Sequence, residues 1–280
     1  MRGLIPGSSM SKWNRPAWVG GTIVALAVMV ALLASVLAPH NPTEQQLARG
    51  LEPPGWEHPF GRDKLGRDIF SRVVYGTRIS FAVGLTTVAA SACVGICIGL
   101  VSGYAGGVVD EVLMRVTDIF LAFPGILLAI ALMAILGPSL RNVVIALCLM
   151  GWVGYARLVR GQILALREYE FVLAARAIGA RPGRIMFRHL LPNALAPVIV
   201  EATFGLAGTI IAEAGLSFLG LGAQPPTPSW GSMLNEGRAF LLVAPHLTIF
   251  PGLAIMLLVL GFNFLGDGLR DALDPKRRGV

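Results

Sequence analysis

Few side chains in this sequence of 280 residues have the types and spacing that catalysis or metal binding requires. The four histidines are scattered, and the three cysteines lie inside apolar runs without the spacing of a zinc site or a disulfide framework. No G-x-x-x-x-G-K-S/T, G-x-S-x-G or H-E-x-x-H motif is present. We therefore predict no catalytic residue, no metal site and no cofactor in this chain, and we do not expect it to be an enzyme.

Glu201 is the side chain with the clearest chemical potential, because it lies deep inside an apolar run. An ionised carboxylate is costly in lipid, so such a residue usually faces a pore or a partner group. Facing a pore, it would meet the amino group of a solute such as a peptide. Facing a neighbouring helix, it would form a structural ion pair with an arginine. The sequence leaves both interpretations open, and the first makes Glu201 a candidate for a translocation path.

The segment 157–192 carries seven arginines against two glutamates. A helical pattern within it ends at Ile178, and the following Gly179 suits the left-handed cap of a helix C-terminus. Pro182 suits the first turn of a second helix. We predict two short helices at a right angle, with small residues exposed at their corner: Ala174, Ala175 and Ala177. Such a corner fits a groove on a soluble partner, whereas the alternative is an amphipathic helix lying on anionic headgroups.

The surrounding chain has the composition of a membrane protein. It is 55% hydrophobic and only 14% charged, whereas soluble domains carry about 25% charged residues. Six apolar runs predict an all-α, polytopic membrane protein with six transmembrane helices. The runs are Ala17–Ala38, about Ile79–Tyr104, about Ile119–Leu136, the stretch between Arg141 and Arg157, about Ala194–Ala214 and about Leu247–Gly266.

Two features of these runs bear on helix packing. The fourth run, as a helix, would reach only ~22 Å at 1.5 Å per residue, short of the ~30 Å bilayer core. We therefore expect either that Arg157 snorkels or that this helix continues into the next segment. On the second run, Gly95, Gly99 and Gly103 are spaced by four, a stripe of small residues that lets another helix backbone approach closely.

Loop charges orient the spans. The net charge is +7, and basic residues gather in segment 1–16, in segment 157–192 and at Lys276–Arg278, which share one side of the membrane if there are six spans. The positive-inside rule then places both termini in the cytoplasm. Segment 1–16 is the predicted cytoplasmic N-terminal segment, and 17–280 is one membrane domain in contact with lipids. Nucleic acid is not an expected partner, because no basic stripe is interleaved with exposed aromatic residues.

Two long segments, 39–70 and 215–245, fall on the extracytoplasmic side. Long loops without obvious secondary structure are usually functional, and docking of a partner is one such use. A folded cap that seals the helix ends is the alternative, and the residues themselves do not decide between the two.

The segment 168–193 resembles the cytoplasmic coupling loop of binding-protein-dependent ABC importers, whose pattern is E-A-A, three residues, then G, and a later L-P. Leu173 stands where that pattern has glutamate. The matching residues are Ala174, Ala175, Gly179, Leu191 and Pro192.

The resemblance extends over nearly the whole chain from about Trp18. The stretch His58–Arg72 resembles the H-P-x-G-T-D-x-x-G-R-D-x-x-S-R motif that follows the first span of dipeptide/oligopeptide permeases, with Arg62 in place of threonine. Segments 215–231 and 250–276 resemble the C-type subunit of that family.

The resemblance implies the transmembrane domain of a type I ABC importer, in the bacterial cytoplasmic (inner) membrane. Its function would be ATP-driven import of di- or oligopeptides by alternating access, with glutathione, D,D-dipeptides or nickel chelates as alternative solutes. The implied partners are a second homologous permease subunit, two ABC ATPase subunits that hold ATP and Mg²⁺, and an extracytoplasmic solute-binding protein. A secondary transporter or channel that works alone would instead predict an internal repeat or paired broken helices, and neither is visible in the sequence.

The resemblance also assigns candidate site residues. Those expected to couple to the ATPases are Ala174, Ala175, Arg176, Gly179, Arg184, Leu191 and Pro192. Those expected to contact the binding protein are Gly61, Asp63, Gly66, Arg67, Asp68, Gln224, Pro225, Pro226 and Trp230.

Overall fold

The computed structural model describes residues 15–273, and within this range the chain forms helices and no strands. Segment 1–14 and the basic residues Lys276–Arg278 lie outside the described range. The main helices are α1 (Arg15–Leu32), α3 (Ile69–Ala105), α4 (Gly107–Leu121), α5 (Gly125–Leu136), α6 (Leu140–Leu166), α9 (Leu191–Phe218) and α11 (His246–Leu273). The shorter ones are α2 (Ala34–Leu37), η1 (Leu47–Arg49), α7 (Glu170–Ala177), α8 (Pro182–Arg184), the π turn η2 (Ile185–Leu190), α10 (Trp230–Gly237) and η3 (Arg238–Phe240).

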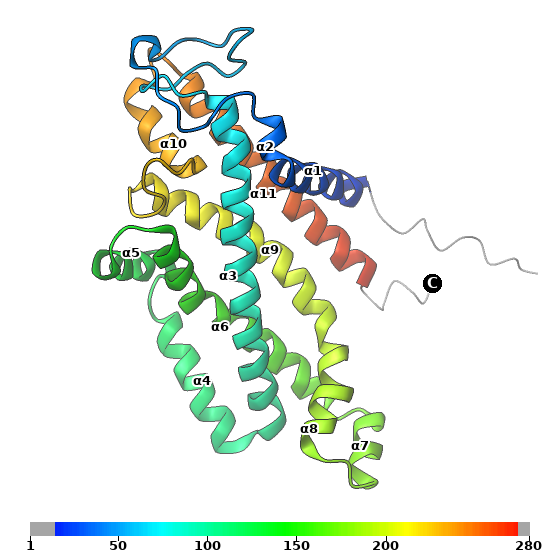
Figure 1. Cartoon of the computed structure of the whole chain (residues 1–280). Coiled ribbons are helices and arrows are strands. Elements are labelled where there is room, and N and C mark those ends of the chain that lie inside the picture. The colour runs from blue at the N-terminus through cyan, green and yellow to red at the C-terminus, as the bar shows by residue number, and fades with distance from the viewer. Residues whose placement is uncertain (1–14, 274–280) are drawn as a thin grey trace, which may run out of the picture.

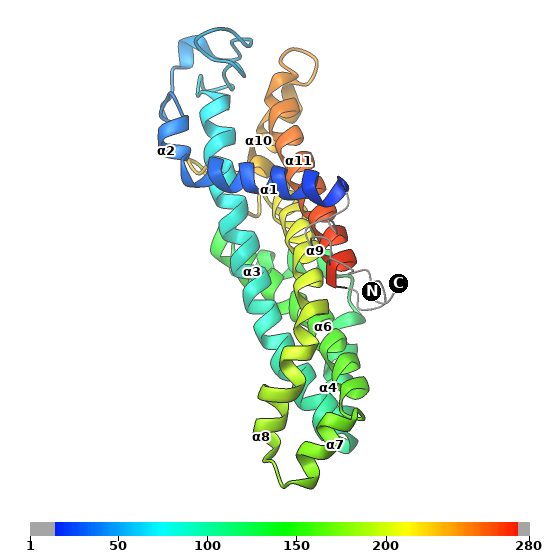
Figure 2. The same ribbon diagram turned by 90° about the vertical axis from the view of Figure 1, so that its right-hand side faces the viewer.

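Five helices of the described range are long and apolar enough to cross a membrane, and the bent pair α4–α5 makes a sixth if it counts as one span. The prediction of an all-α protein with several spans is therefore confirmed. Figure 1 shows α3 running along most of the molecule, with segment 39–68 and α10 near one end and α7 and α8 at the other. Figure 2 shows α1 lying across α3, and α1 also packs closely against α11, where Gly20 meets the backbone of Gly261.

The third span differs from the prediction. The sequence pattern suggested one uninterrupted helix over about Ile119–Leu136, preceded by a loop. The helix α4 instead begins at Gly107, and α5 leaves it at an angle of 80°. The bend falls just before Pro124, which lacks an N–H group and disfavours helical geometry in the residue before it.

The helix α6 explains how the short fourth run spans the membrane. Its 27 residues give a length of ~40 Å, because it continues past Arg157 to Leu166. Arg157 is half-exposed and pairs with Asp118 of α4. Of the two routes predicted for this run, the structure shows the continuing helix.

The glycine stripe on α3 forms the closest helix contact in this region. A Cβ atom at Gly95 would lie 2.6 Å from the carbonyl oxygen of Trp152, and one at Gly99 would lie 2.4 Å from that of Ala156. At Gly103 the same distance to the Arg160 carbonyl oxygen is 3.0 Å. The prediction that this stripe admits another backbone is confirmed, and the other backbone is that of α6.

We expect Gly99→Ala to destabilise the protein, because the new methyl group would displace the α6 backbone; overpacking of this kind costs about 1–3 kcal/mol. Gly161→Ala on α6 is the matched control, since a Cβ atom there meets nothing within 4 Å. Thermal unfolding of the two purified variants in detergent measures the difference. Equal unfolding temperatures would show that α3 and α6 are not held together by this contact.

Candidate functional site

The helix α7 ends in a tightly capped corner. Gly179 has a φ of +77°, a left-handed conformation that costs glycine little. The Gly179 N–H donates to the Arg176 carbonyl at 2.9 Å, and the Ala180 N–H donates to the Ala175 carbonyl at 3.0 Å. These two hydrogen bonds define a Schellman cap, so the predicted helix end at Gly179 is confirmed.

The second half of the corner is longer than expected. Pro182 begins α8 as predicted, but the helix does not stop after a few residues. It passes through the π turn η2 into α9, and the whole run Pro182–Phe218 counts as one candidate span. The prediction of a second short helix is therefore wrong: its buried side chains, Ile185 and Leu190, continue the apolar face of α9.

Burial divides the predicted coupling residues into two groups. Ala175 was predicted to be exposed, but it is buried, with only 7% of its surface accessible. It shares the inner face of α7 with the fully buried Val172. The Arg176 guanidinium lies over the Tyr104 ring at 5.5 Å from its centroid, which ties α7 to the end of α3. The exposed members are Ala174, Arg176, Gly179, Arg184 and Pro192, and Leu191 is half-buried.

The corner also exposes large apolar side chains that the sequence analysis did not single out. Leu173 is 46% exposed, Phe187 62% and Ile178 85%. Apolar groups that gather at a helix corner facing away from the other spans indicate a contact surface for another protein. The signal was present in the sequence at Leu173, which stands where the coupling-loop pattern has a charged glutamate.

An ion pair between α4 and α6 holds the base of this corner. The Arg160 guanidinium donates to both carboxylate oxygens of Asp110, at 2.5 and 2.6 Å, and the Ser102 hydroxyl donates to the same carboxylate. A bidentate pair of this kind fixes orientation as well as distance. Arg160 is therefore a structural residue, because it joins α6 to α4.

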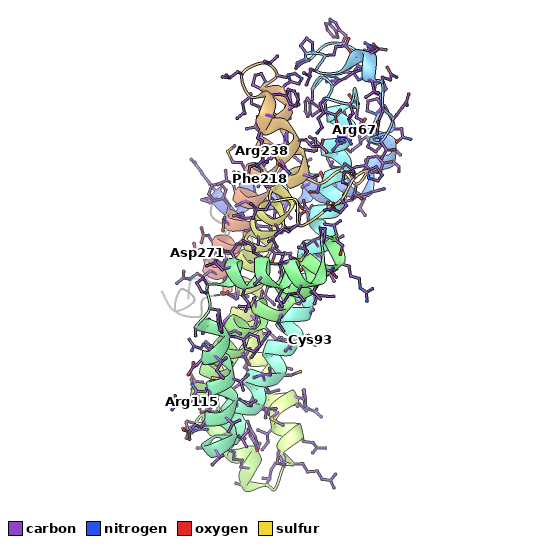
Figure 3. The ribbon with its side chains drawn as sticks, turned by 90° about the vertical axis from the view of Figure 1, so that its left-hand side faces the viewer. Arg67, Cys93, Arg115, Phe218, Arg238 and Asp271 are labelled. Atoms are coloured by element: carbon purple, nitrogen blue, oxygen red, sulfur yellow. The ribbon has the colours of Figure 1, made fainter. Side chains whose placement is uncertain are left out.

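At the other end of the molecule, segment 39–68 folds over a buried ionic network. Arg67 pairs with Asp63 at 2.6 Å and with Glu236 of α10 at 2.5 Å. Arg72, 1% exposed, pairs with the same two carboxylates at 3.2 and 3.4 Å. The network joins the segment to α3 and α10, and Figure 3 shows Arg67 within this lobe. Nearby, Arg238 lies over the Phe218 ring at 5.6 Å and attaches η3 to the end of α9.

Arg62, the residue that departs from the family pattern, is also buried and contacts three neighbouring groups. Its guanidinium donates to the Gly66 carbonyl at 2.8 Å, lies 3.2 Å from the Glu52 carboxylate and donates to Nε2 of His58. Because Nε2 accepts that hydrogen bond, Nδ1 carries the imidazole proton and donates to Asp68 at 2.9 Å. Asp68 in turn accepts from the Ser71 N–H and caps α3.

The same histidine belongs to the group of side chains in the described range best placed to hold a metal. The ligand atoms of His40, His58 and Asp68 lie within 4.8 Å of one another. A cation there would have to displace the proton that His58 shares with Asp68, beside the positive charge of Arg62. The donor set therefore fits a hydrogen-bonded structural cluster better than a metal centre.

These contacts revise the predicted binding-protein surface. Asp63, Arg67, Asp68 and Trp230 are at most 4% exposed, and Gly61 and Gly66 are buried as well. The Trp230 Nε1–H donates inward to the Val73 carbonyl at 3.0 Å. Of the residues expected to contact a binding protein, those with exposed side chains are Gln224, Pro225 and Pro226.

Segment 215–245 is also more ordered than its sequence suggested. The helix α9 extends to Phe218, and α10 and η3 fold within the segment, which leaves 219–229 as its longest non-helical stretch. Both segments expose apolar side chains. These are Leu47 and Trp56 in segment 39–68, and Leu242 and Val243 in segment 215–245.

A surface cluster on the same side is held by Arg49. It pairs with Glu52 at 2.8 Å and with Glu57 at 3.0 Å. The hydrogen bonds from Arg49 lower the pKa of both carboxyl groups, so both stay ionised at neutral pH. Since all three side chains are solvated, this cluster contributes little to stability.

We expect Arg67→Ala to destabilise the protein by about 3–5 kcal/mol, because it leaves the buried Asp63 carboxylate and the partly buried Glu236 carboxylate with one cation instead of two. Arg49→Ala is the matched control, and it should unfold at the wild-type temperature. The measurement is thermal unfolding in detergent followed by tryptophan fluorescence. An equal effect of the two substitutions would contradict a structural role for the buried network.

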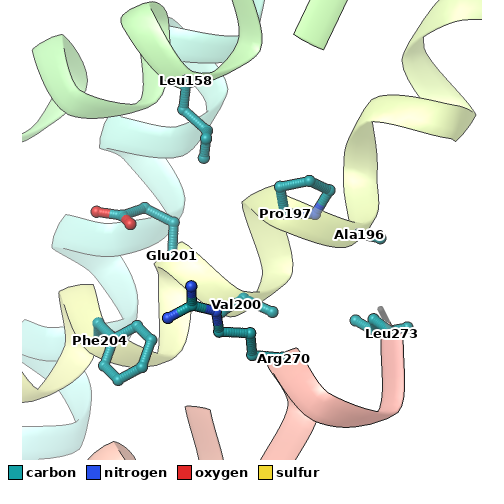
Figure 4. Close-up of a pocket in the computed structure, with 8 residues that line it drawn as sticks. All are labelled: Leu158, Ala196, Pro197, Val200, Glu201, Phe204, Arg270 and Leu273. Carbon is teal, nitrogen blue, oxygen red and sulfur yellow. The ribbon is translucent and has the colours of Figure 1, made fainter. Parts of the chain in front are cut away.

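Glu201 lies on α9 between two cavities. The first, of about 460 Å³, is bounded by Leu158, Pro197, Phe204 and Arg270 among others. Figure 4 shows the Glu201 carboxylate pointing away from the Arg270 guanidinium, and no ion pair joins these two described side chains. The second cavity, of about 310 Å³, lies between α3, α6 and α9. The alternative prediction, a structural ion pair with an arginine of a neighbouring span, is therefore not observed.

Comparison with known proteins assigns the chain to a family. A family model described as a binding-protein-dependent transport system inner membrane component matches residues 95–279. Another, the N-terminal transmembrane domain of oligopeptide transport permease C, matches residues 12–54. The dipeptide transport system permease protein DppC of Alkalihalophilus pseudofirmus is 49% identical over 95% of this chain and 88% of its own length.

Other relatives and solved structures agree. The glutathione transport system permease protein GsiD of Pectobacterium atrosepticum is 48% identical over 93% of this chain and 87% of its own length. Two crystal forms of the methionine ABC transporter MetNI in inward-facing conformations match with a TM-score of 0.56. At 20% and 21% identity they cover 72% and 74% of this chain, and 96% and 98% of their own chains. These structures bear on the fold, and they confirm the predicted type I importer domain.

Proposed function

Because the chain belongs to the family of binding-protein-dependent transport system inner membrane components and is a permease subunit of an ABC importer, we propose that it carries short peptides into the cytoplasm in response to ATP hydrolysis by partner subunits. The observation that carries the proposal is the corner α7–Gly179–α8. It is capped on one side, continuous with a spanning helix on the other, and covered with exposed apolar side chains.

The proposed partners follow from the two ends of the molecule. The corner faces the ATPase subunits, which hold ATP and Mg²⁺, and lies with both termini in the cytoplasm. A second homologous permease subunit completes the path. Among the predicted coupling residues, Ala174, Gly179, Arg184 and Pro192 would form the contact, and Leu173, Ile178 and Phe187 would join them. Ala175, Arg176 and Leu191 would hold the corner in shape.

The extracytoplasmic solute-binding protein would dock at the opposite end. The exposed part of the predicted surface, 224–226, lies in the non-helical stretch before α10. The exposed apolar tips at Trp56, Leu242 and Val243 would extend this surface, since apolar patches on a polar lobe mark protein contacts. The buried residues of the His58–Arg72 motif would support the surface without touching the partner.

One continuous helix supports alternating access as the mechanism. The run Pro182–Phe218 begins at the corner, carries Glu201 midway, and ends where α10 packs closely: a Cβ atom at Gly231 would lie 2.2 Å from the Ala214 carbonyl oxygen. A displacement of the corner by the ATPases would therefore reach the path and the extracytoplasmic lobe as a rigid-body movement.

The names of the relatives, a dipeptide permease and a glutathione permease, support a peptide as the solute. A peptide with a free amino group also suits a carboxylate such as Glu201 that has no ion-pair partner among the described residues. D,D-dipeptides also carry a free amino group, whereas a nickel chelate would not offer such a group to Glu201.

Reconstitution tests the proposal against a transporter that works alone. The chain would be purified with its co-expressed partners and placed in liposomes with the binding protein. ATP-dependent uptake of a radiolabelled dipeptide would support the proposal. Uptake that needs neither ATP nor an ATPase subunit would overturn it in favour of a secondary transporter or channel.

We expect Gly179→Val to uncouple ATP hydrolysis from uptake, because a β-branched residue at φ +77° is strained by about 1–3 kcal/mol and would distort the corner. Gly183→Val is the matched control, four residues away in α8, where a Cβ atom meets nothing within 4 Å and φ is not positive. ATPase activity and uptake would be measured on both intact complexes. Normal uptake by Gly179→Val would contradict the proposed role of the corner.

We expect Glu201→Gln to lower the uptake of a free dipeptide about tenfold, which corresponds to ~1.4 kcal/mol of lost charge-assisted hydrogen bonding. Uptake of the N-acetylated dipeptide should not change. Glu111→Gln, which alters an exposed carboxylate on α4, should behave as the wild type. If free and acetylated dipeptides respond equally to Glu201→Gln, Glu201 does not recognise an amino group.

A further inference from the structure

Glu213 is the most deeply buried carboxyl group in the described part of the chain, and neither the translocation path nor the ionic network uses it. It lies on α9 shortly before this helix ends at Phe218, and it is 0% exposed. No cation pairs with it among the described residues. A buried carboxyl group without a cation is costly unless hydrogen bonds satisfy it. Its hydrogen bonds lead to the stretch 219–229, which we call the α9–α10 loop.

The first link joins Glu213 to the beginning of this loop. The Ser217 hydroxyl donates to Glu213 Oε1 at 2.7 Å, and the same hydroxyl oxygen accepts from the Ala223 N–H at 3.1 Å. The loop passes directly over this hydroxyl, because a Cβ atom at Gly222 would clash with Ser217 Oγ. The carboxyl group therefore fixes the direction of the Ser217 hydroxyl, and through it the backbone of the loop.

The second link joins Glu213 to the end of the loop. Ser229 lies next to the same carboxyl group and is 0% exposed. It is also the N-cap of α10, where its Oγ accepts from the Ser232 N–H at 3.2 Å. The first turn of α10 packs on α9 at this level, since a Cβ atom at Gly231 would clash with the Ala214 carbonyl oxygen. One side chain thus contacts both ends of the α9–α10 loop.

The middle of the loop carries the exposed part of the predicted docking surface. Gln224, Pro225 and Pro226 are exposed. The Gln224 side-chain amide donates to the carbonyls of Gly220 and Gly222 at 3.0 and 3.1 Å, which folds the loop back on its own beginning. Proline has a fixed φ, so the two prolines leave the middle of the loop few conformations. The direction in which these residues point is then set by the two ends.

We propose that Glu213 is a positioning residue for docking of the solute-binding protein: by holding both ends of the α9–α10 loop, it sets the conformation in which Gln224, Pro225 and Pro226 face that partner. Its role is indirect, because a fully buried carboxyl group cannot touch the partner. The inference rests on the proposed function and deepens it by naming the interaction that shapes the docking surface.

The role depends on hydrogen bonds and not on charge, which makes glutamine a suitable replacement. The amide of glutamine has the shape of the carboxyl group, and its oxygen can accept from the Ser217 hydroxyl. Its N–H groups can donate to Ser229. Alanine at position 213 removes both links.

ATPase activity of the intact importer complex in liposomes, titrated with binding protein, tests the inference. Glu213→Ala should raise the concentration of binding protein that gives half-maximal activity about tenfold, because loss of the buried hydrogen bonds frees the loop. The activity at saturation should equal that of the wild type, and Glu213→Gln should restore the half-maximal concentration. A merely structural role would lower the saturating activity and leave that concentration unchanged.

Thr203→Val is the matched control. Thr203 is also buried on α9, at 8% exposure, but its hydroxyl donates to the Val200 carbonyl of its own helix at 2.7 Å and does not reach the loop. The half-maximal concentration for this variant should equal that of the wild type. Hydrogen exchange of the same complexes reports on the loop itself: Glu213→Ala should speed exchange of the Ala223 amide and leave segment 39–68 unchanged.

Uptake by the wild-type complex separates the two proposals. If it imports a dipeptide with ATP but Glu213→Ala keeps the wild-type half-maximal concentration, the inference is overturned and the proposed function stands. If the wild type imports no dipeptide, both are overturned. Should Glu213→Ala not assemble, Ser217→Ala decides: it removes the hydroxyl between the carboxyl group and Ala223, and it should raise the half-maximal concentration about threefold. An unchanged concentration in Ser217→Ala would equally overturn the inference.

Discussion

The close approach of α3 and α6 is the constraint on which the other features depend. Gly95, Gly99 and Gly103 bring the two backbones together, and no other residue type fits between them. This contact sets the rotation of α6 and hence the direction of its side chains. The Cβ atom of Tyr155 packs against Gly95, and its ring extends to Gly205 on α9. On the same helix, Arg160 reaches Asp110 on α4. A single glycine stripe therefore orients a buried tyrosine and the ion pair that supports the corner.

A second constraint is the continuity of the helix that starts at Pro182. Because it runs through the π turn without stopping, the corner, Glu201 and the contact with α10 belong to one stiff element. A hinged connection would absorb a displacement at the corner, whereas a continuous helix passes it on. The same continuity keeps the corner in one conformation, in which Leu173, Ile178 and Phe187 stay exposed instead of packing against the corner itself.

The segment 39–68, together with the start of α3, shows how charged residues in a motif can pair in the interior. The stretch His58–Arg72 has the polarity of a surface loop, yet its arginines and aspartates pair with one another and with Glu236 below the surface. The network holds a long segment with little secondary structure in one conformation. The segment is thus folded and internally paired, as the interpretation of a folded cap holds.

The sequence by itself determined the membrane character, the approximate spans, the glycine stripe and the cap at Gly179, because each follows from local composition or from the conformational range of one residue. It also carried the family resemblance. Only the tertiary structure decided which residues of the His58–Arg72 motif are buried, that Ala175 faces inward, that the third span bends before Pro124, and that Glu201 has no arginine partner among the described residues. It alone placed the Glu213 carboxyl group beside both Ser217 and Ser229. Burial and pairing depend on which elements meet, and residues far apart in the chain meet through packing that no local pattern records.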